Sequence, residues 1–416
     1  MRKVYMISGG VTRFQKAQPQ ATFQALVQQA FDVAYSDLPR LRKEHIGGTV
    51  ASYFSDHFHH QLMAGILAHD ALGLSPRPSK RVEGGGASGG LCFQTAYEAI
   101  ASGRMELCVA LGFETMSQVR TAKGNELIAM ASDMNFDYPL GGFYTGYYAM
   151  MVVRHQHEFG TTPLQMAKVA VKNHANALAN PFAQAPKKLT VRDVRESPMV
   201  AYPLTRLDCC VMSDGAAVAI LASEKMAAKL CANPILISGV GSATDTMRLG
   251  DRLFGAVPLL PHESKKEYAG LEYPGVHSCR AGRLAAREAY AMAKIKNPLN
   301  ELDFVELHDA FTSSEIQAYE DLGLCRVGAG GSYIDSGNAH YGGKCPVNLS
   351  GGLIGAGHAI GATGLMQAVF AFWQLQGTLK KHFGNTNLQL KNPKRGLIHS
   401  HGGTGTYVAV SILEKP

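Results

Sequence analysis

The chain has 416 residues, of which 46% are hydrophobic and 18% are charged, and its formal net charge is +7. This length allows more than one hydrophobic core, and the composition is typical of a globular protein. No apolar run reaches the roughly 18 residues that a membrane span needs, and the strand-like, glycine-containing start disfavours a signal peptide. No Lys/Arg run or nucleic-acid-binding motif accompanies the positive charge, so it suits small anionic ligands better than nucleic acid.

Eight cysteines are scattered along the chain without CxxC spacing. This usage predicts a reduced, cytoplasmic protein that has neither a disulfide framework nor a zinc ribbon of its own. His57, His59 and His60 are close in sequence. Their spacing without carboxylate support is more typical of a loop or an interface, so we predict no metal site.

Predicted strands and helices alternate along the first half. The strands are expected at 3–9, 46–52, 107–112 and 213–222, and the helices at 22–36 and 61–73. Near-continuous apolar strands are typical of a parallel or mixed sheet that is covered by helices on both faces. Residues 118–200 are longer and more polar, with a helix expected at 163–179. We expect this stretch to be an insertion over one face of the sheet.

Residues 81–103 form the most distinctive local pattern, a short strand, a glycine turn and an amphipathic helix. Gly84, Gly85 and Gly86 allow the backbone to turn sharply before the helix begins. The helix would direct free N–H groups and its positive dipole end toward the turn. A nucleophile on this turn would gain a lowered pKa and an oxyanion hole, yet the tip of the turn is Gly86.

The second half repeats the strand and helix order of the first. Strands are expected at 235–240 and 303–307, helices at 278–294 and 312–322, a glycine turn leading into a helix at 346–376, and a strand–turn–strand unit at 396–413. We therefore predict an α/β fold made from a duplicated unit, with halves at 1–225 and 226–416. The two glycine turns are expected to face each other across a pseudo-twofold axis.

Several segments together resemble the thiolase superfamily, most closely the sterol-carrier-protein-type thiolases and the archaeal acetoacetyl-CoA thiolases. The segments are VEGGGASGG, ALGFETMS, LDCCVMSDGAAVAILASE, ELHDAFTSSEIQAYEDLGL, VNLSGGLIGAGHAIGATG and HSHGGTG. The resemblance implies a five-layered αβαβα fold with mixed sheets, two-fold dimers, and Claisen condensation or thiolysis of acyl-CoA thioesters. Coenzyme A would be a substrate, with no covalently bound cofactor and no metal.

The resemblance also implies roles for individual residues. His358 in the GHxxG element corresponds to the base that activates the nucleophile, and His308 in HDAF to a histidine of the first oxyanion hole. His399 falls where many thiolases carry a second cysteine, although a core histidine is an equal alternative. Among the predicted cofactor-binding residues, Asn348 would orient His358 or a loop, with a plain turn residue as an equal alternative. The last glycine turn, which contains Gly402 and Gly403, would donate a backbone N–H to the second oxyanion hole.

Two positions depart from the family pattern. Gly86 stands where the nucleophilic cysteine belongs, and Ala310 stands where the sterol-carrier type has its acid/base cysteine. Among the remaining cysteines, Cys92 is expected in the core, and only Cys345 lies near the GHxxG turn. Covalent acyl transfer should therefore be lost or slowed.

Three functions fit this pattern. The first is a thiolase-type acyl-CoA acyltransferase without its usual nucleophile, in which Gly86→Cys would restore a thiol within reach of His358. The second is retro-aldol cleavage of a β-hydroxyacyl-CoA, which needs a base and an oxyanion hole but no nucleophile; Tyr333, His340 and Tyr341 are candidate acid/base groups. The third is a non-catalytic acyl-CoA-binding subunit, which the retained histidines disfavour.

The resemblance further implies a homodimer, and related proteins pair with a small zinc-ribbon/OB-fold subunit. The aromatic and glycine-rich segment 138–148 suits either a lid over the acyl chain or a dimer-contact loop. Lys187, Lys188 and Arg192 could meet the CoA phosphates or could simply face solvent.

Overall fold

The computed structural model describes residues 2–252, 254–271 and 276–416. Within these residues a nine-stranded mixed sheet has the order β3-β2-β4-β7-β1-β8-β11-β10-β9. The strands are β1 (Val4–Val11), β2 (Gly48–Ser52), β3 (Ser79–Val82), β4 (Leu107–Thr115), β7 (Asp214–Ser223), β8 (Ile235–Thr244), β9 (Phe304–Glu306), β10 (Arg395–Gly402) and β11 (Tyr407–Glu414).

The sheet consists of two halves that meet at a narrow junction. β1 pairs along its length with β7, and β8 pairs along its length with β11. Across the junction, β1 and β8 pair only at Tyr5 with Leu236 and at Met6 with Ile235. The strand order on either side of the junction fits the predicted duplication, with β7 and β11 in equivalent places.

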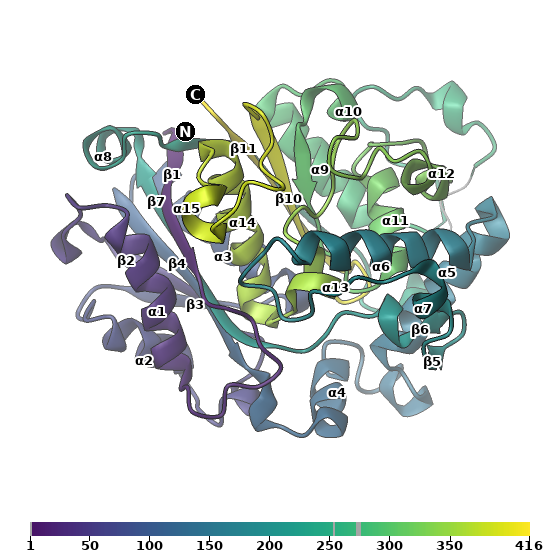
Figure 1. Cartoon of the computed structure of the whole chain (residues 1–416), viewed down its shortest axis with the longest axis horizontal. Coiled ribbons are helices and arrows are strands. Elements are labelled where there is room, and N and C mark those ends of the chain that lie inside the picture. Colours follow the sequence, from purple (N-terminus) through teal and green to yellow (C-terminus); the bar gives the residue numbers. More distant parts are fainter. Residues whose placement is uncertain (1, 253, 272–275) are drawn as a thin grey trace.

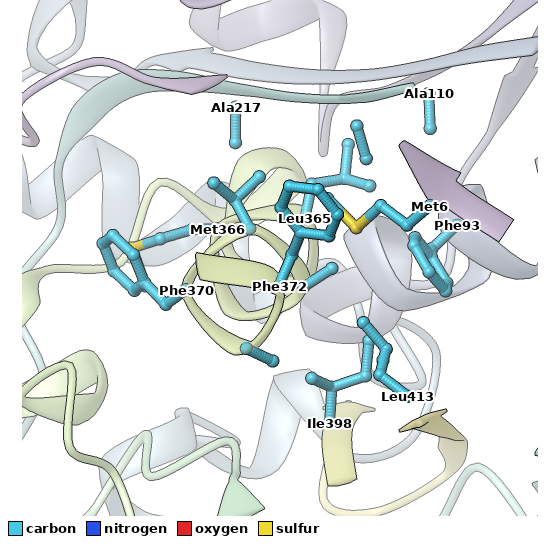
Figure 2. Packing of buried hydrophobic residues seen from close by; sticks show 14 of the residues in the cluster. Met6, Phe93, Ala110, Ala217, Leu365, Met366, Phe370, Phe372, Ile398 and Leu413 are labelled. Carbon is cyan, nitrogen blue, oxygen red and sulfur yellow. The ribbon is translucent and has the colours of Figure 1, made fainter. Parts of the chain in front are cut away.

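Two helices, α3 (Ser88–Ala101) and α14 (Ile360–Gln376), lie between the two half-sheets (Figure 1). Every residue of α14 up to Leu375 is buried, as expected of a helix that is apolar on all sides. Figure 2 shows why: side chains of α14 pack between Ala110 and Ala217 of one half-sheet and Ile398 and Leu413 of the other.

Further helices cover the outer faces of the sheet. α1 (Phe23–Ser36) packs on β1 and β7, and α9 (Arg280–Ala293) packs on β8 and β11. α1 turns its apolar face inward, as its predicted periodicity required. The resulting order of helices, half-sheet, central helices, half-sheet and helices confirms the predicted thiolase-like α/β fold.

The remaining helices cover the edges and the site. They are α2 (Ala64–Ala71), α4 (Thr121–Ala129), α5 (Tyr144–Phe159), α6 (Pro163–Ala177), α7 (Val191–Arg195), α8 (Glu224–Leu230), α10 (Pro298–Glu301), α11 (Thr312–Asp321), α12 (Gly330–Asp335), α13 (Gly352–Ala356) and α15 (Leu379–Phe383). The predicted insertion is mainly helical, with one small hairpin of β5 (Met199–Ala201) and β6 (Leu204–Thr205) beginning at its end. In the described part of the chain, none of the helices could span a membrane.

Glycines bring the first turns of α3 and α14 into close contact. A Cβ added at Gly89 would lie 2.6 Å from the Gly364 backbone nitrogen, and one added at Gly364 would fall on the Gly90 backbone nitrogen. Because backbone atoms fill these positions, a side chain at either residue would push the helices apart. The residues that precede the two helices, Gly86 and His358, are therefore brought to the lining of the same cavity.

This contact predicts the effect of one added methyl group. Gly364→Ala should destabilise the protein by about 1–3 kcal/mol, because the overpacked site cannot relax without moving a helix. Gly146→Ala in α5, where an added Cβ has open space, should be neutral or stabilising by up to ~1 kcal/mol. Urea unfolding of both variants measures the difference, and equal stabilities would contradict the tight helix contact.

Candidate active site

A cavity of about 550 Å³ lies where the first turns of α3 and α14 meet the end of β10. Its polar lining includes the backbone of Gly85 and Gly86, three histidine rings and Tyr148. The histidines are His308, His358 and His401. The sequence predicted that His308 and His358 would share a site, and the structure brings them together with their ring centroids 4.9 Å apart.

His358 is fixed at both its backbone and its ring. Its backbone N–H donates to the Ser213 hydroxyl at 2.8 Å, and its Nδ1 lies 2.8 Å from the Thr363 hydroxyl. Since that hydroxyl donates its single proton to the Ala359 carbonyl, it must accept from Nδ1. Burial lowers the pKa of His358 to about 3. The ring is therefore neutral at physiological pH, and Nε2 carries a free electron pair that can accept a proton.

His308 follows β9 and points at the turn before α3. Its side chain is buried, and burial, together with the neighbouring His401, lowers its pKa well below the usual 6.5. Among the described residues, its Nδ1 has no hydrogen-bond partner. Its Nε2 faces Gly86 and, when protonated, can donate to an oxygen of a bound ligand.

His399 and His401 project from the same face of β10, two residues apart. His399 lies behind the cavity, where its Nδ1 accepts a bond of 3.4 Å from the His308 backbone N–H. His401 lines the cavity itself, with its ring centroid 4.3 Å from that of His308. The sequence pointed to His399 and missed His401, although the alternation in His-Ser-His could have indicated both.

Tyr148 is the second polar cavity residue that the sequence did not identify. Its hydroxyl lies 2.6 Å from His401 Nε2 and 2.9 Å from the Gly403 carbonyl oxygen. Burial raises the pKa of Tyr148 well above 10, so the phenol keeps its proton. Tyr148 belongs to α5, so the end of the aromatic and glycine-rich segment 138–148 is a helix that lines the cavity.

Gly86 occupies a position with no room for a side chain. An added Cβ would lie 2.5 Å from the His401 carbonyl oxygen and 2.8 Å from Cε1 of His308. The nearest ring to this position is that of His308, and the reach of a thiol here to His358 stays a prediction. The atoms around the turn leave space only for a residue without a side chain.

Two cysteines also line the cavity, but neither resembles an activated nucleophile. Burial raises the pKa of Cys209 to about 12 and that of Cys210 still further. A thiol with such a pKa is protonated at neutral pH and is a poor nucleophile. Cys92 and Cys345 are buried elsewhere, and burial raises the pKa of each to about 12.

Asn348 lies outside the cavity, in a polar network beneath His308. Its Oδ1 accepts from the Leu307 N–H at 2.8 Å, and its Nδ2 donates to Glu315 at 2.8 Å. Asp309 joins the network through Asn173 and also accepts from the Leu353 N–H at the start of α13. The network fixes the strand end that carries His308. A ligand-binding role for Asn348 stays a prediction.

The other predicted groups are spread over the molecule. Tyr333 donates to the Cys345 carbonyl at 2.9 Å, the half-exposed Tyr341 donates to the Gln389 carbonyl at 3.1 Å, and His340 lies beside Tyr341 in the same loop. None of the three is among the residues that line the cavity. Lys187, Lys188 and Arg192 are exposed and also lie outside its lining.

The predicted glycines of the last turn lie where two cavities meet. A second cavity of about 410 Å³ shares Gly85 and Gly403 with the first and is also lined by Gly402.

Acidic, histidine and cysteine side chains form no group of three or more that could hold a metal ion in the described ranges. The arrangement combines a neutral base, a hydrogen-bond donor and a protonated phenol around a glycine turn.

Comparisons with known proteins show which family and which solved structure this chain is similar to. Residues 4–225 match the thiolase N-terminal domain, and residues 267–415 match the thiolase C-terminal domain-like family. The chain is 39% identical to an acetyl-CoA acetyltransferase of Methanothermobacter thermautotrophicus over 84% of this chain and 83% of the relative. It is 31% identical to sterol carrier protein 2 of Homo sapiens, over 98% of this chain and 71% of that protein. A solved Ltp2-ChsH2(DUF35) aldolase has a similar fold, with a TM-score of 0.79 at 24% identity over 99% of this chain and 98% of that one.

The enclosed histidines predict a specific acid response. Burial holds the pKa of His399 at about 4 and that of His401 well below 6.5. Unfolding therefore takes up protons below pH 6.5, and stability should fall as the pH drops from about 6.5 toward 4. His401→Phe should reduce this slope by up to about 1.4 kcal/mol per pH unit. Chemical denaturation at several pH values measures the slope, and an unchanged slope would contradict a neutral, buried His401.

Proposed function

The chain belongs to the thiolase family, and we propose that it cleaves or forms a carbon–carbon bond in a CoA thioester without an acyl-enzyme intermediate. The proposed reaction is the retro-aldol cleavage of a β-hydroxyacyl-CoA and its reverse. This proposal rests on the positions of the atoms that surround Gly86. The His401 carbonyl and the His308 ring occupy the space that a nucleophilic side chain would need.

The proposed cleavage begins with a proton transfer from the β-hydroxyl to His358 Nε2. The Cα–Cβ bond breaks as the β-carbon becomes a carbonyl, and its electron pair moves into the thioester to form an enolate. His308 Nε2–H and the positive end of α3 stabilise the enolate oxygen. The enolate then takes a proton at Cα, which releases the shortened acyl-CoA. The protein groups are all neutral before the reaction, and His358 carries a positive charge only between the first proton transfer and the return of that proton.

Thiolase-type acyl transfer is the second candidate. It is supported by the pairing of His308 with His358 and by the relatives named acetyl-CoA acetyltransferases. This candidate requires a thiolate, and both cysteines of the cavity have strongly raised pKa values. A purely binding role fits less well, since His358 is oriented as a base.

We also propose two partners, in a reducing, cytoplasmic compartment. The first is a second copy of the chain, because β3 ends the sheet with an unpaired edge in the described structure. Beside β3, Leu62, Met63 and Ile66 expose 73%, 69% and 43% of their surface. Exposed apolar residues next to a free strand edge are typical of an interface. The second partner is a small DUF35-type subunit, as in the Ltp2-ChsH2(DUF35) aldolase.

The base assignment predicts the pH profile and the effect of one substitution. His358→Asn should lower the cleavage rate of a β-hydroxyacyl-CoA by about 10²–10⁴-fold, as loss of a general base does. Because the pKa of His358 is about 3, its basic form is already complete at pH 5, and the wild-type rate should show no acid limb between pH 5 and 8. Chromatographic detection of the shorter acyl-CoA measures both.

Gly86→Cys separates the two enzymatic candidates. On the proposed function the variant gains no thiolysis of a 3-ketoacyl-CoA and is less stable than the Gly146→Ala control, since its Cβ collides with the His401 carbonyl. Robust acetyl transfer to free CoA by Gly86→Cys, abolished by iodoacetamide, would instead favour the acyltransferase candidate.

The interface predicts the state of the chain in solution. Light scattering at micromolar concentration should report a dimer for the wild-type chain and a monomer for the double variant Leu62→Asp and Ile66→Asp. Leu178→Asp, which places the same charge on an exposed leucine at the end of α6, should remain dimeric. A wild-type monomer would refute the interface.

A further inference from the structure

The cavity lacks an acid at the position where the sterol-carrier-type thiolases carry their acid/base cysteine. Ala310 stands there, and its side chain has no proton to give. The adjacent residue, Phe311, packs against the ring of Tyr148 with centroids 4.4 Å apart. Ala310, Phe311 and Tyr148 all line the same cavity. A phenol from α5 is thus placed beside the site of the missing thiol.

The hydroxyl of Tyr148 is held by two partners of different kinds. The Gly403 carbonyl can only accept, so the phenol donates its single proton there at 2.9 Å. His401 Nε2, at 2.6 Å, then donates to the phenolic oxygen. A donor at this position would stabilise the phenolate that remains after the proton has left. The environment therefore favours a protonated phenol at rest and supports its conjugate base during reaction.

No other described tyrosine in the cavity has this arrangement. Tyr144 also lines the cavity, but its hydroxyl donates to the Ala131 carbonyl at 2.9 Å and has no histidine beside it. Tyr147 packs against Tyr144 and is not among the cavity-lining residues. His308 and His358 are both neutral, and the proposed cleavage already uses them.

We propose that Tyr148, supported by His401, is the general acid that protonates Cα of the thioester enolate. This inference rests on the proposed function and names the group that completes the reaction. The phenolic O–H bond breaks, its proton bonds to Cα, and the electron pair of the enolate forms the new C–H bond. The phenolate regains a proton from the His358 imidazolium, which holds the proton of the substrate hydroxyl. No proton is gained or lost over the cycle.

The test is hydrogen exchange at Cα of acetyl-CoA or propanoyl-CoA in D₂O, followed by mass spectrometry. This exchange requires enolate formation and reprotonation but no carbon–carbon cleavage. Tyr148→Phe should lower the exchange rate by about 10²-fold or more, while the affinity for the acyl-CoA changes less than about twofold, because only one oxygen atom is lost. His401→Gln should lower the rate less than Tyr148→Phe does.

Tyr147→Phe is the matched control, since it removes the neighbouring phenol outside the cavity lining and should keep the wild-type exchange rate. Exchange by Tyr148→Phe at the wild-type rate would overturn the inference, and so would a loss of acyl-CoA affinity that fully accounts for the slower exchange. Wild-type exchange without cleavage of any β-hydroxyacyl-CoA would refute the proposed retro-aldol function while supporting the acid role of Tyr148.

Discussion

The direct backbone contact between α3 and α14 is the constraint on which the rest of this structure depends. Gly89 and Gly364 allow the first turns of two buried helices to approach more closely than side chains would permit. The approach brings a glycine turn, one histidine and the end of a strand to a common point. The same two helices also fill the space between the half-sheets. The packing of the core and the geometry of the site therefore depend on the same helix contact.

The chemistry of the site follows from desolvation. Four buried imidazoles lie close together, and desolvation is the main cause of the lowered pKa of each, so each would lose solvation free energy on taking a charge. Hydrogen bonds with Thr363 and Tyr148 then decide which nitrogen atoms of His358 and His401 carry protons. Such a site suits reactions that start from neutral protein groups and develop charge only transiently, on the bound substrate and on the groups that exchange its protons.

Much of this fold was predictable because its signals are local. Apolar runs located the strands, and the glycine turn followed by an apolar helix at 346–376 located α14. The family resemblance, carried by short motifs, identified His308 and His358. Tyr148 and His401 were missed because 253 positions separate them in the chain, and only the folded structure brings them together. The glycines around Tyr148 also suggested a loop, whereas burial against Phe311 stabilises a helix there. The division of the chain at residue 225 stays a prediction.

The narrow junction between the half-sheets has a consequence for how the chain can be assembled. With only two paired positions between β1 and β8, backbone hydrogen bonds contribute little to joining the halves. Instead, α14 of the second half covers strands of the first, and α3 of the first half covers strands of the second. Each half therefore completes the hydrophobic interior of the other. Neither would be a stable fragment on its own, and the two halves should fold and unfold as a single cooperative unit.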